Sequence, residues 1–160
     1  MSTDKALREH VLYLLDPGGA HIGFEQAIEK FPFELAAKRV PNLAHTTWSL
    51  VYHLWFCQWD ILDFSINPKY EYHSYPRDYW PAEDAPSGEE KWNQTIESIH
   101  RDLESMKSLV ADESNDLFEP FAWGNGQTLL REALLVADHN SYHIGQIVDI
   151  RMLLGVPVKD

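Results

Sequence analysis

Apolar residues recur every three or four positions over much of the chain, which is the spacing of helices that bury one face. The clearest stretch has its apolar positions at Trp92, Ile96, Ile99, Leu103, Met106 and Val110. Ser87 and Glu90 lie three residues apart just before it, which predicts a capping box at the start of the helix. The polar run from Asp112 to Asp116 predicts its end.

A second long helix is predicted to begin with Thr46 or Thr47 as its cap and to end near Ile66, before Asn67-Pro68. Its apolar residues cover most of its circumference. A helix with this pattern is typical of the centre of a protein rather than of its surface.

A third long helix is predicted from Thr128 to Leu154, because Thr128 can cap the first turn and Gly155 and Pro157 end the pattern. At a rise of about 1.5 Å per residue it would be roughly 40 Å long.

The N-terminal region predicts two shorter helices. Leu7, Val11 and Leu14 form the apolar stripe of the first, a break follows at Pro17 to Gly19, and the second carries the apolar residues Phe24, Ile28 and Phe31.

No alternating pattern of the kind that predicts strands lies between these helices. The segments 70–86 and 118–127 have no period and are predicted to be long connections. The sequence therefore predicts an all-α protein, a four-helix bundle with long crossover connections, in a single domain over residues 1–160.

The composition agrees with one aromatic-rich core. Of the 160 residues, 44% are hydrophobic and 12% aromatic, enough to bury a sizeable core at this length. The formal net charge is −12 and no basic run exists, so nucleic acid and anionic membrane surfaces are excluded as expected partners.

The single cysteine, Cys57, rules out an internal disulfide and suits a reducing compartment. The apolar run from Val11 to Leu15 is too short for the core of a signal peptide, and no stretch approaches the roughly 20 apolar residues of a membrane span. We therefore expect a cytoplasmic protein that does not enter a membrane.

His139 and His143 are the strongest candidates for chemistry. They lie four residues apart on the last predicted helix, which places both imidazoles on one face about 6 Å apart along the axis. The same stripe carries Ile147 and Ile150, so both rings are expected to face the core. Two imidazoles there either bind buried carboxylates or carbonyls or hold a cation.

His53 is the third candidate, because nearly every neighbour on its predicted helix is apolar or aromatic. If the two helices are adjacent, His53, His139 and His143 form a three-imidazole set. Three neutral nitrogens leave open positions on a divalent metal, as catalytic sites do. The alternative for His53 is a core histidine whose ring bonds to protein groups.

Two better-known metal motifs fail. A His-Glu-x-x-His protease needs a glutamate after the first histidine, and Asn140 occupies that place. A ferritin-like site needs two Glu-x-x-His motifs, and only Glu97 with His100 matches. That pair lies off the apolar stripe and is predicted to be a solvated pair on the helix surface.

Four further residues are secondary candidates: His10, His21, Glu25 and His45. Of these, His21 and His45 could approach the mouth of a bundle pocket, and ordinary surface or capping roles are the alternative.

Four residues near the three histidines are candidates for additional metal ligands or for hydrogen-bond partners of the rings. Cys57 lies one turn after His53, but apolar surroundings would raise the pKa of its thiol, which predicts an inert core cysteine. Asp60 lies two turns beyond His53, too far to share a metal with it. Asp138 and Gln146 could orient imidazoles, or could be solvated.

With these residues the chain resembles the DinB/YfiT-like superfamily of metal-binding four-helix bundles. The resemblance rests on His53 within Leu50–Trp55, on Gln58–Phe64, and on the late blocks Gly126–Glu132 and Ala137–Gln146. The order of one histidine on the second helix and His-x-x-x-His on the fourth matches. The crossover Tyr79-Trp80-Pro81 and the early Gly18–His21 also resemble one branch of the superfamily.

The resemblance implies that His53, His139 and His143 bind a divalent metal, nickel, zinc or iron, and that the protein is a homodimer. Members of the superfamily include S-transferases and isomerases that use low-molecular-weight thiols, and proteins described as metal-dependent hydrolases. No thiol-binding motif is evident, and an anionic thiol would need a nearby cation. Arg151, two turns beyond His143, is the candidate.

Three function classes therefore stand open. The first is a metal-dependent enzyme that transfers a thiol or hydrolyses a small molecule, with no general base that the sequence identifies. The second is a non-enzymatic metal-binding or stress-related helical dimer with a closed pocket. The third is a helical bundle whose histidine core holds no metal.

Overall fold

The computed structural model describes residues 3–16 and 20–158. Their helices are α1 (Thr3–Leu15), α2 (Phe24–Ile28), the short 3-10 helix η1 (Phe33–Leu35), α3 (Thr47–Ile66), α4 (Glu89–Ala111) and α5 (Leu129–Leu153). These residues form no β-strand, only an isolated bridge between Pro120 and Thr128. The predicted all-α class is confirmed, while the break predicted at Pro17 to Gly19 lies outside the described residues.

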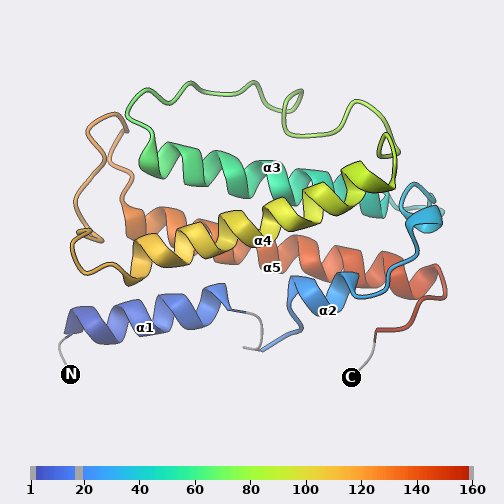
Figure 1. The fold of residues 1–160 in the computed structure, drawn as a ribbon, viewed down its shortest axis with the longest axis horizontal. Helices are drawn as coiled ribbons and strands as arrows, with labels where there is room; N and C mark the ends of the chain where they lie inside the picture. Colours follow the sequence, from blue (N-terminus) through green and yellow to red (C-terminus); the bar gives the residue numbers. More distant parts are fainter. Residues whose placement is uncertain (1–2, 17–19, 159–160) are drawn as a thin grey trace.

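The three longest helices form the body of the molecule (Figure 1). α3 packs against both α4 and α5, while α1 and α2 lie end to end along the opposite side. α1 contacts α4 and α5, and α2 contacts α5. The connection over residues 67–88 runs back along α3 to the start of α4, so it forms a cover over one side of that helix.

α3 is the central helix, as its sequence predicts. Thr46 is its cap, where its side chain accepts a hydrogen bond from the Ser49 amide while the Ser49 hydroxyl accepts from the Thr46 amide. Most of its side chains are buried, including Leu50, Val51 and Leu54. Even so, none of the helices in the described part of the chain has the length and apolar character to cross a membrane.

The ends of α5 agree with the prediction, but the start of α4 does not. The Thr128 side chain accepts a hydrogen bond from the Arg131 amide, and Gly155, with φ +78°, turns the chain out of α5. The predicted Ser87–Glu90 capping box is wrong, because α4 begins one residue later with Gly88 as its cap and no side-chain bond. Glu89 and Glu90 instead place negative charge at the positive end of the helix dipole.

The stripe predicted for α1 is correct at Leu7 and Val11, which pack in the core, and wrong at Leu14. Val11 and Leu15 are buried, whereas Leu14 is 55% exposed. The third buried position is Arg8, whose guanidinium donates to the carbonyl oxygen of Val110 at the end of α4. A charged residue that satisfies helix carbonyls thus takes a position that a purely apolar pattern cannot reveal.

Candidate metal centre

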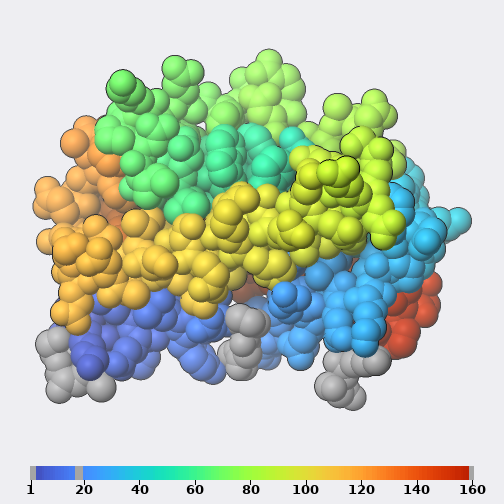
Figure 2. Space-filling model, viewed as in Figure 1, coloured from blue at the N-terminus to red at the C-terminus, as the bar shows by residue number. Residues whose placement is uncertain are grey.

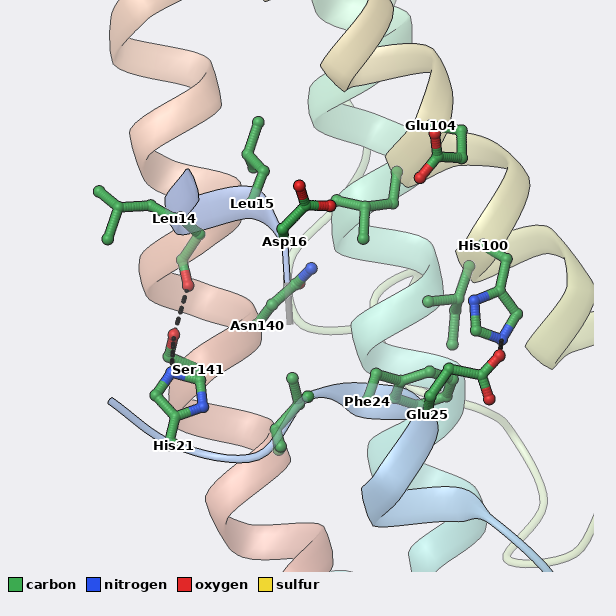
Figure 3. Close-up of a pocket in the computed structure, with 15 residues that line it drawn as sticks. Leu14, Leu15, Asp16, His21, Phe24, Glu25, His100, Glu104, Asn140 and Ser141 are labelled. Atoms are coloured by element: carbon green, nitrogen blue, oxygen red, sulfur yellow. Dashed lines mark hydrogen bonds and ion pairs between the residues drawn. The ribbon is translucent and has the colours of Figure 1, made fainter. Parts of the chain in front are cut away.

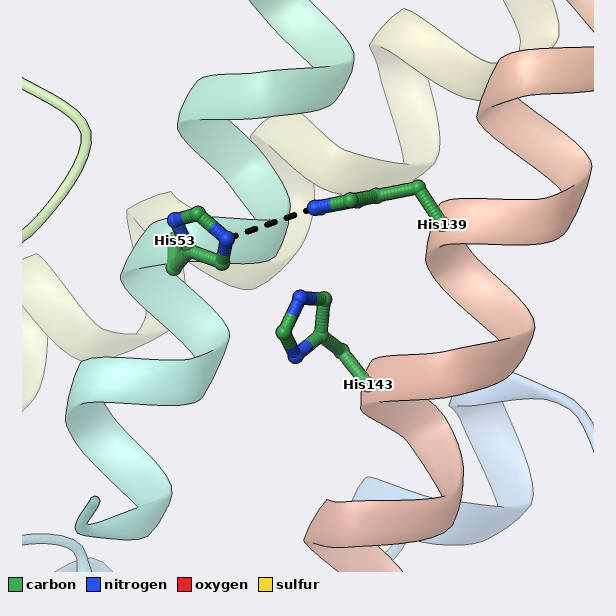
Figure 4. Close-up of side chains that lie close together, drawn as sticks. All are labelled: His53, His139 and His143. Atoms are coloured by element: carbon green, nitrogen blue, oxygen red, sulfur yellow. Dashed lines mark hydrogen bonds between the residues drawn. The ribbon is translucent and has the colours of Figure 1, made fainter. Parts of the chain in front are cut away.

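Three histidines from two helices meet in the interior of the molecule (Figure 4). His53 projects from α3, and His139 and His143 project from α5 one turn apart. Each of the three rings offers a ligand atom, and these atoms all lie within 4.8 Å of one another. The arrangement is that of a group that could hold a metal ion, and it brings together the three residues that the sequence selects.

Hydrogen bonds fix which nitrogen of two rings carries a proton. His53 Nδ1 lies 2.9 Å from the carbonyl oxygen of Tyr79, and His143 Nδ1 lies 2.7 Å from Gln146 Oε1. Both oxygens can only accept, so both Nδ1 atoms carry the hydrogen. The Nε2 atom of each neutral ring therefore keeps its lone pair, as a metal ligand requires.

The third ring supplies an observation that fits a cation. His139 Nε2 lies 3.3 Å from His53 Nε2, while its buried Nδ1 has no hydrogen-bond partner among the described residues. The Zn–N distance of 2.0–2.1 Å in tetrahedral sites gives nitrogens about 3.3 Å apart. The His53–His139 pair already has this separation, and two nitrogens so close need a shared proton or a shared cation.

Burial keeps the imidazoles neutral. Desolvation lowers the pKa of His53 to about 4, against the opposing effect of the bond to Tyr79. Desolvation, reinforced by the two neighbouring imidazoles, lowers the pKa of His139 to about 4. Burial also lowers the pKa of His143. At neutral pH the rings are uncharged and their lone pairs are free for a ligand bond.

An aromatic side chain from the crossover covers the site. The Trp80 ring stacks on His53 with centroids 3.9 Å apart and on His45 with centroids 4.2 Å apart. The prediction that His45 approaches the mouth of the pocket is thereby confirmed. A cavity of about 490 Å³ adjoins the three histidines, and His45, Tyr79 and Trp80 are among the residues that line it.

Asp60 plays a part that the sequence did not indicate. It is too far along α3 to join the three histidines, as predicted, but its buried carboxylate accepts hydrogen bonds from the hydroxyls of Tyr70 at 2.6 Å and Tyr79 at 2.7 Å. Tyr79 is thus tied to α3 at both ends, through its hydroxyl to Asp60 and through its carbonyl to His53. We call Asp60, Tyr70 and Tyr79 the crossover clamp.

Of the other residues predicted near the histidines, some contact the rings and one does not. Gln146 binds His143, as expected of an orienting residue. Asp138 does not: it is exposed and lines a separate cavity with Tyr13 and Leu134. Cys57 lines the histidine cavity, with Sγ 3.5 Å from His53 Nδ1, and burial raises the pKa of its thiol to about 12. It is a protonated thiol, as the sequence predicts.

Several secondary candidates lie elsewhere. His21 and Glu25 line a second cavity of about 480 Å³ between the end of α1, α2, α4 and α5 (Figure 3). There His21 bonds to the Ser141 hydroxyl. His100, which the sequence predicts to pair with Glu97, pairs with Glu25 instead. Figure 2 shows this hollow between α4 and the two N-terminal helices. His10 is exposed on α1.

Arg151 is not available to an anionic ligand of the site. Its side chain is buried, and its guanidinium donates to the carbonyl oxygens of Ala27, Val156 and Pro157. It closes the C-terminal end of α5 onto α2. The expectation that it could pair with a thiol carrying negative charge is therefore wrong.

The chain matches no protein-family model, no curated protein and no solved structure.

Proposed function

We propose that the protein is a metal-dependent enzyme of the DinB/YfiT-like superfamily, in which His53, His139 and His143 bind nickel, zinc or iron. The observation that carries this proposal is the convergence of three neutral imidazoles, two of which have their Nδ1 hydrogens held by protein oxygens. Acceptors of this kind accompany most histidine ligands of metals. When bound, such an ion supplies Lewis acidity and activates water or a thiol as a nucleophile.

We also propose that the protein is a four-helix bundle with a long crossover, a homodimer and cytoplasmic. The end-to-end packing of α1 and α2 beside α3, α4 and α5 supports a four-helix bundle whose first helix is interrupted. The long 67–88 connection supports the crossover. A homodimer and a cytoplasmic location complete the proposal, the first from the resemblance and the second from the single cysteine.

The chain's own residues define what can happen beside the ion. Trp80 covers one face of His53 and excludes water from that side, while the adjoining cavity gives a small molecule access to the three nitrogens. The cavity supports an enzyme over the closed pocket of a purely metal-binding protein. Burial raises the pKa of the Cys57 thiol, so this cysteine is not the proposed nucleophile.

His45 lines the cavity but is not one of the three converging imidazoles. The Trp80 ring stacks on both His45 and His53 and so separates His45 from the proposed ion. We therefore assign no general base.

Of the two reactions, hydrolysis is favoured. Transfer from a glutathione-like anionic thiol needs an Arg or Lys side chain in addition to the ion, and Arg151 is committed to backbone oxygens. Hydrolysis requires no such partner.

An activity panel tests the proposal. Metal-loaded protein is assayed with esters and amides, and in parallel with low-molecular-weight thiols and the electrophile monochlorobimane. We expect turnover that chelation and His143→Ala both abolish. Turnover that survives both treatments would refute the mechanism, and the absence of turnover with every substrate would favour the non-enzymatic class.

A further inference from the structure

The cavity beside the three histidines has an aromatic mouth. Tyr75, Tyr79, Trp80 and Tyr142 line it, the first three from the crossover and the last from α5. Tyr142 is 66% exposed and Tyr75 is 74% exposed, so two large rings stand at the rim with most of their surface in solvent. When a flat apolar group covers rings exposed in this way, the buried apolar surface favours binding.

The same wall lacks charge. No Lys, Arg, Asp or Glu of the described residues lines this cavity. Two charged pairs lie in the flanking segments: Arg77 pairs with Asp78 at 2.6 Å, and Arg39 pairs with Asp84 at 2.6 Å. The formal net charge of −12 adds a field that repels anions.

These two observations select the chemistry of a ligand. Apart from the ion proposed at the three histidines, a charged group at the aromatic mouth would lose its hydration without a side chain of opposite charge to replace it. An uncharged aromatic group would lose little hydration and would cover the exposed tyrosine rings. The size of the cavity, about 490 Å³, suits a single small molecule.

We propose that the substrate is an uncharged small molecule that carries an aromatic ring, with its ring against Tyr142 and Tyr75 and its polar end toward the three histidines. This inference rests on the proposed function, since it takes the histidines as the reactive centre. It assigns the discrimination among substrates to Tyr142 and Tyr75, and it predicts that a negative charge added to the ring weakens binding.

Three hydroxamic acids that share one metal-binding group test this proposal. Acetohydroxamic acid has no ring, benzohydroxamic acid adds one, and 4-carboxybenzohydroxamic acid adds a negative charge to that ring. Isothermal titration of zinc-loaded protein gives the three dissociation constants. We expect benzohydroxamic acid to bind about tenfold more tightly than acetohydroxamic acid, and the carboxylate derivative to bind more weakly than its parent.

A matched pair of variants separates the mouth from the general surface. Tyr142→Ala should remove most of the preference for benzohydroxamic acid and leave the affinity for acetohydroxamic acid unchanged. Tyr72→Ala is the control, because Tyr72 is equally exposed at 67% but does not line the cavity. It should preserve the preference.

The outcomes distinguish the two proposals. If the protein takes up zinc at the three histidines but the carboxylate derivative binds most tightly, or Tyr142→Ala leaves the preference intact, the substrate inference is wrong and the metal site stands. If zinc content per chain does not depend on the histidines, the proposed function is wrong and the inference falls with it.

Discussion

At the scale of single residues, the acceptors around the imidazoles determine what the site can bind. His53 and His143 could each present either nitrogen, and one oxygen apiece settles the choice. The three histidines themselves are predictable from sequence, because their spacing and apolar neighbours place them on inward faces. The Tyr79 carbonyl is not predictable, since every residue has a carbonyl and only the path of the chain shows which one reaches His53.

Gln146→Ala should weaken zinc binding about 10- to 100-fold, because His143 loses the acceptor that holds its Nδ1 hydrogen. Competition with a chromophoric chelator measures the affinity. Gln94→Ala is the control, as Gln94 is an exposed glutamine on α4 whose side chain donates to Glu90. Equal affinities for the two variants would show that Gln146 does not orient the ligand.

At the scale of elements, the ends of α3 and α5 can be predicted from the sequence, whereas the contacts that the connections make cannot. α3 and α5 begin and end at the predicted caps because local side chains determine a helix end. The crossover clamp joins Asp60 on α3 to tyrosines 10 and 19 residues later, across a segment without periodicity. Pairings of this kind depend on tertiary contact, so only the structure reveals them.

The crossover clamp offers a matched pair of single-atom changes. Tyr70→Phe and Tyr79→Phe each remove one hydroxyl bond to Asp60, and each should cost about 1 kcal/mol of unfolding free energy. Only Tyr79 also supplies the acceptor of His53, through its main-chain carbonyl, which Phe keeps. Because Tyr79→Phe releases that residue from Asp60, the carbonyl is held less firmly and zinc binding should weaken more than in Tyr70→Phe. Urea unfolding and zinc titration measure the two effects. An equal loss of affinity in both variants would contradict the role given to Tyr79.

Asp102 on α4 gives a pH-dependent prediction. Its side chain is buried, its Oδ2 has no hydrogen-bond partner in the described part of the chain, and desolvation raises its pKa, against the effect of Arg101. A carboxyl whose pKa is raised by folding stabilises the protein below its unfolded pKa, near 3.9, and this stability is lost as the pH rises through the folded value.

Asp102→Asn removes the buried charge, so the variant should exceed the wild-type protein in unfolding free energy at pH 7 by on the order of 1 kcal/mol. The difference should shrink as the pH falls toward 4. Urea unfolding at a series of pH values checks it. A constant difference across that range would show that Asp102 is not held with a raised pKa.

At the scale of the whole molecule, two clusters of buried apolar residues, one of them rich in aromatic rings, hold α3 and α5 in the register that brings the histidines together. The sequence predicts a single helical domain, because its long periodic stripes and its composition leave no other architecture. It does not predict that Arg8 and Arg151 are buried, since each satisfies carbonyls supplied by segments distant in sequence. For the same reason the uncharged mouth of the cavity becomes visible only in three dimensions.

The central claim is that His53, His139 and His143 hold one metal ion per chain. The direct measurement is the metal content of protein purified without an affinity tag, by mass spectrometry of the elements, for the wild type and for His53→Ala, His139→Ala and His10→Ala. We predict about one ion per chain in the wild type and in the exposed control His10→Ala, and loss of most of it in the other two, with helical circular dichroism retained. Unchanged stoichiometry in His53→Ala and His139→Ala would contradict the account.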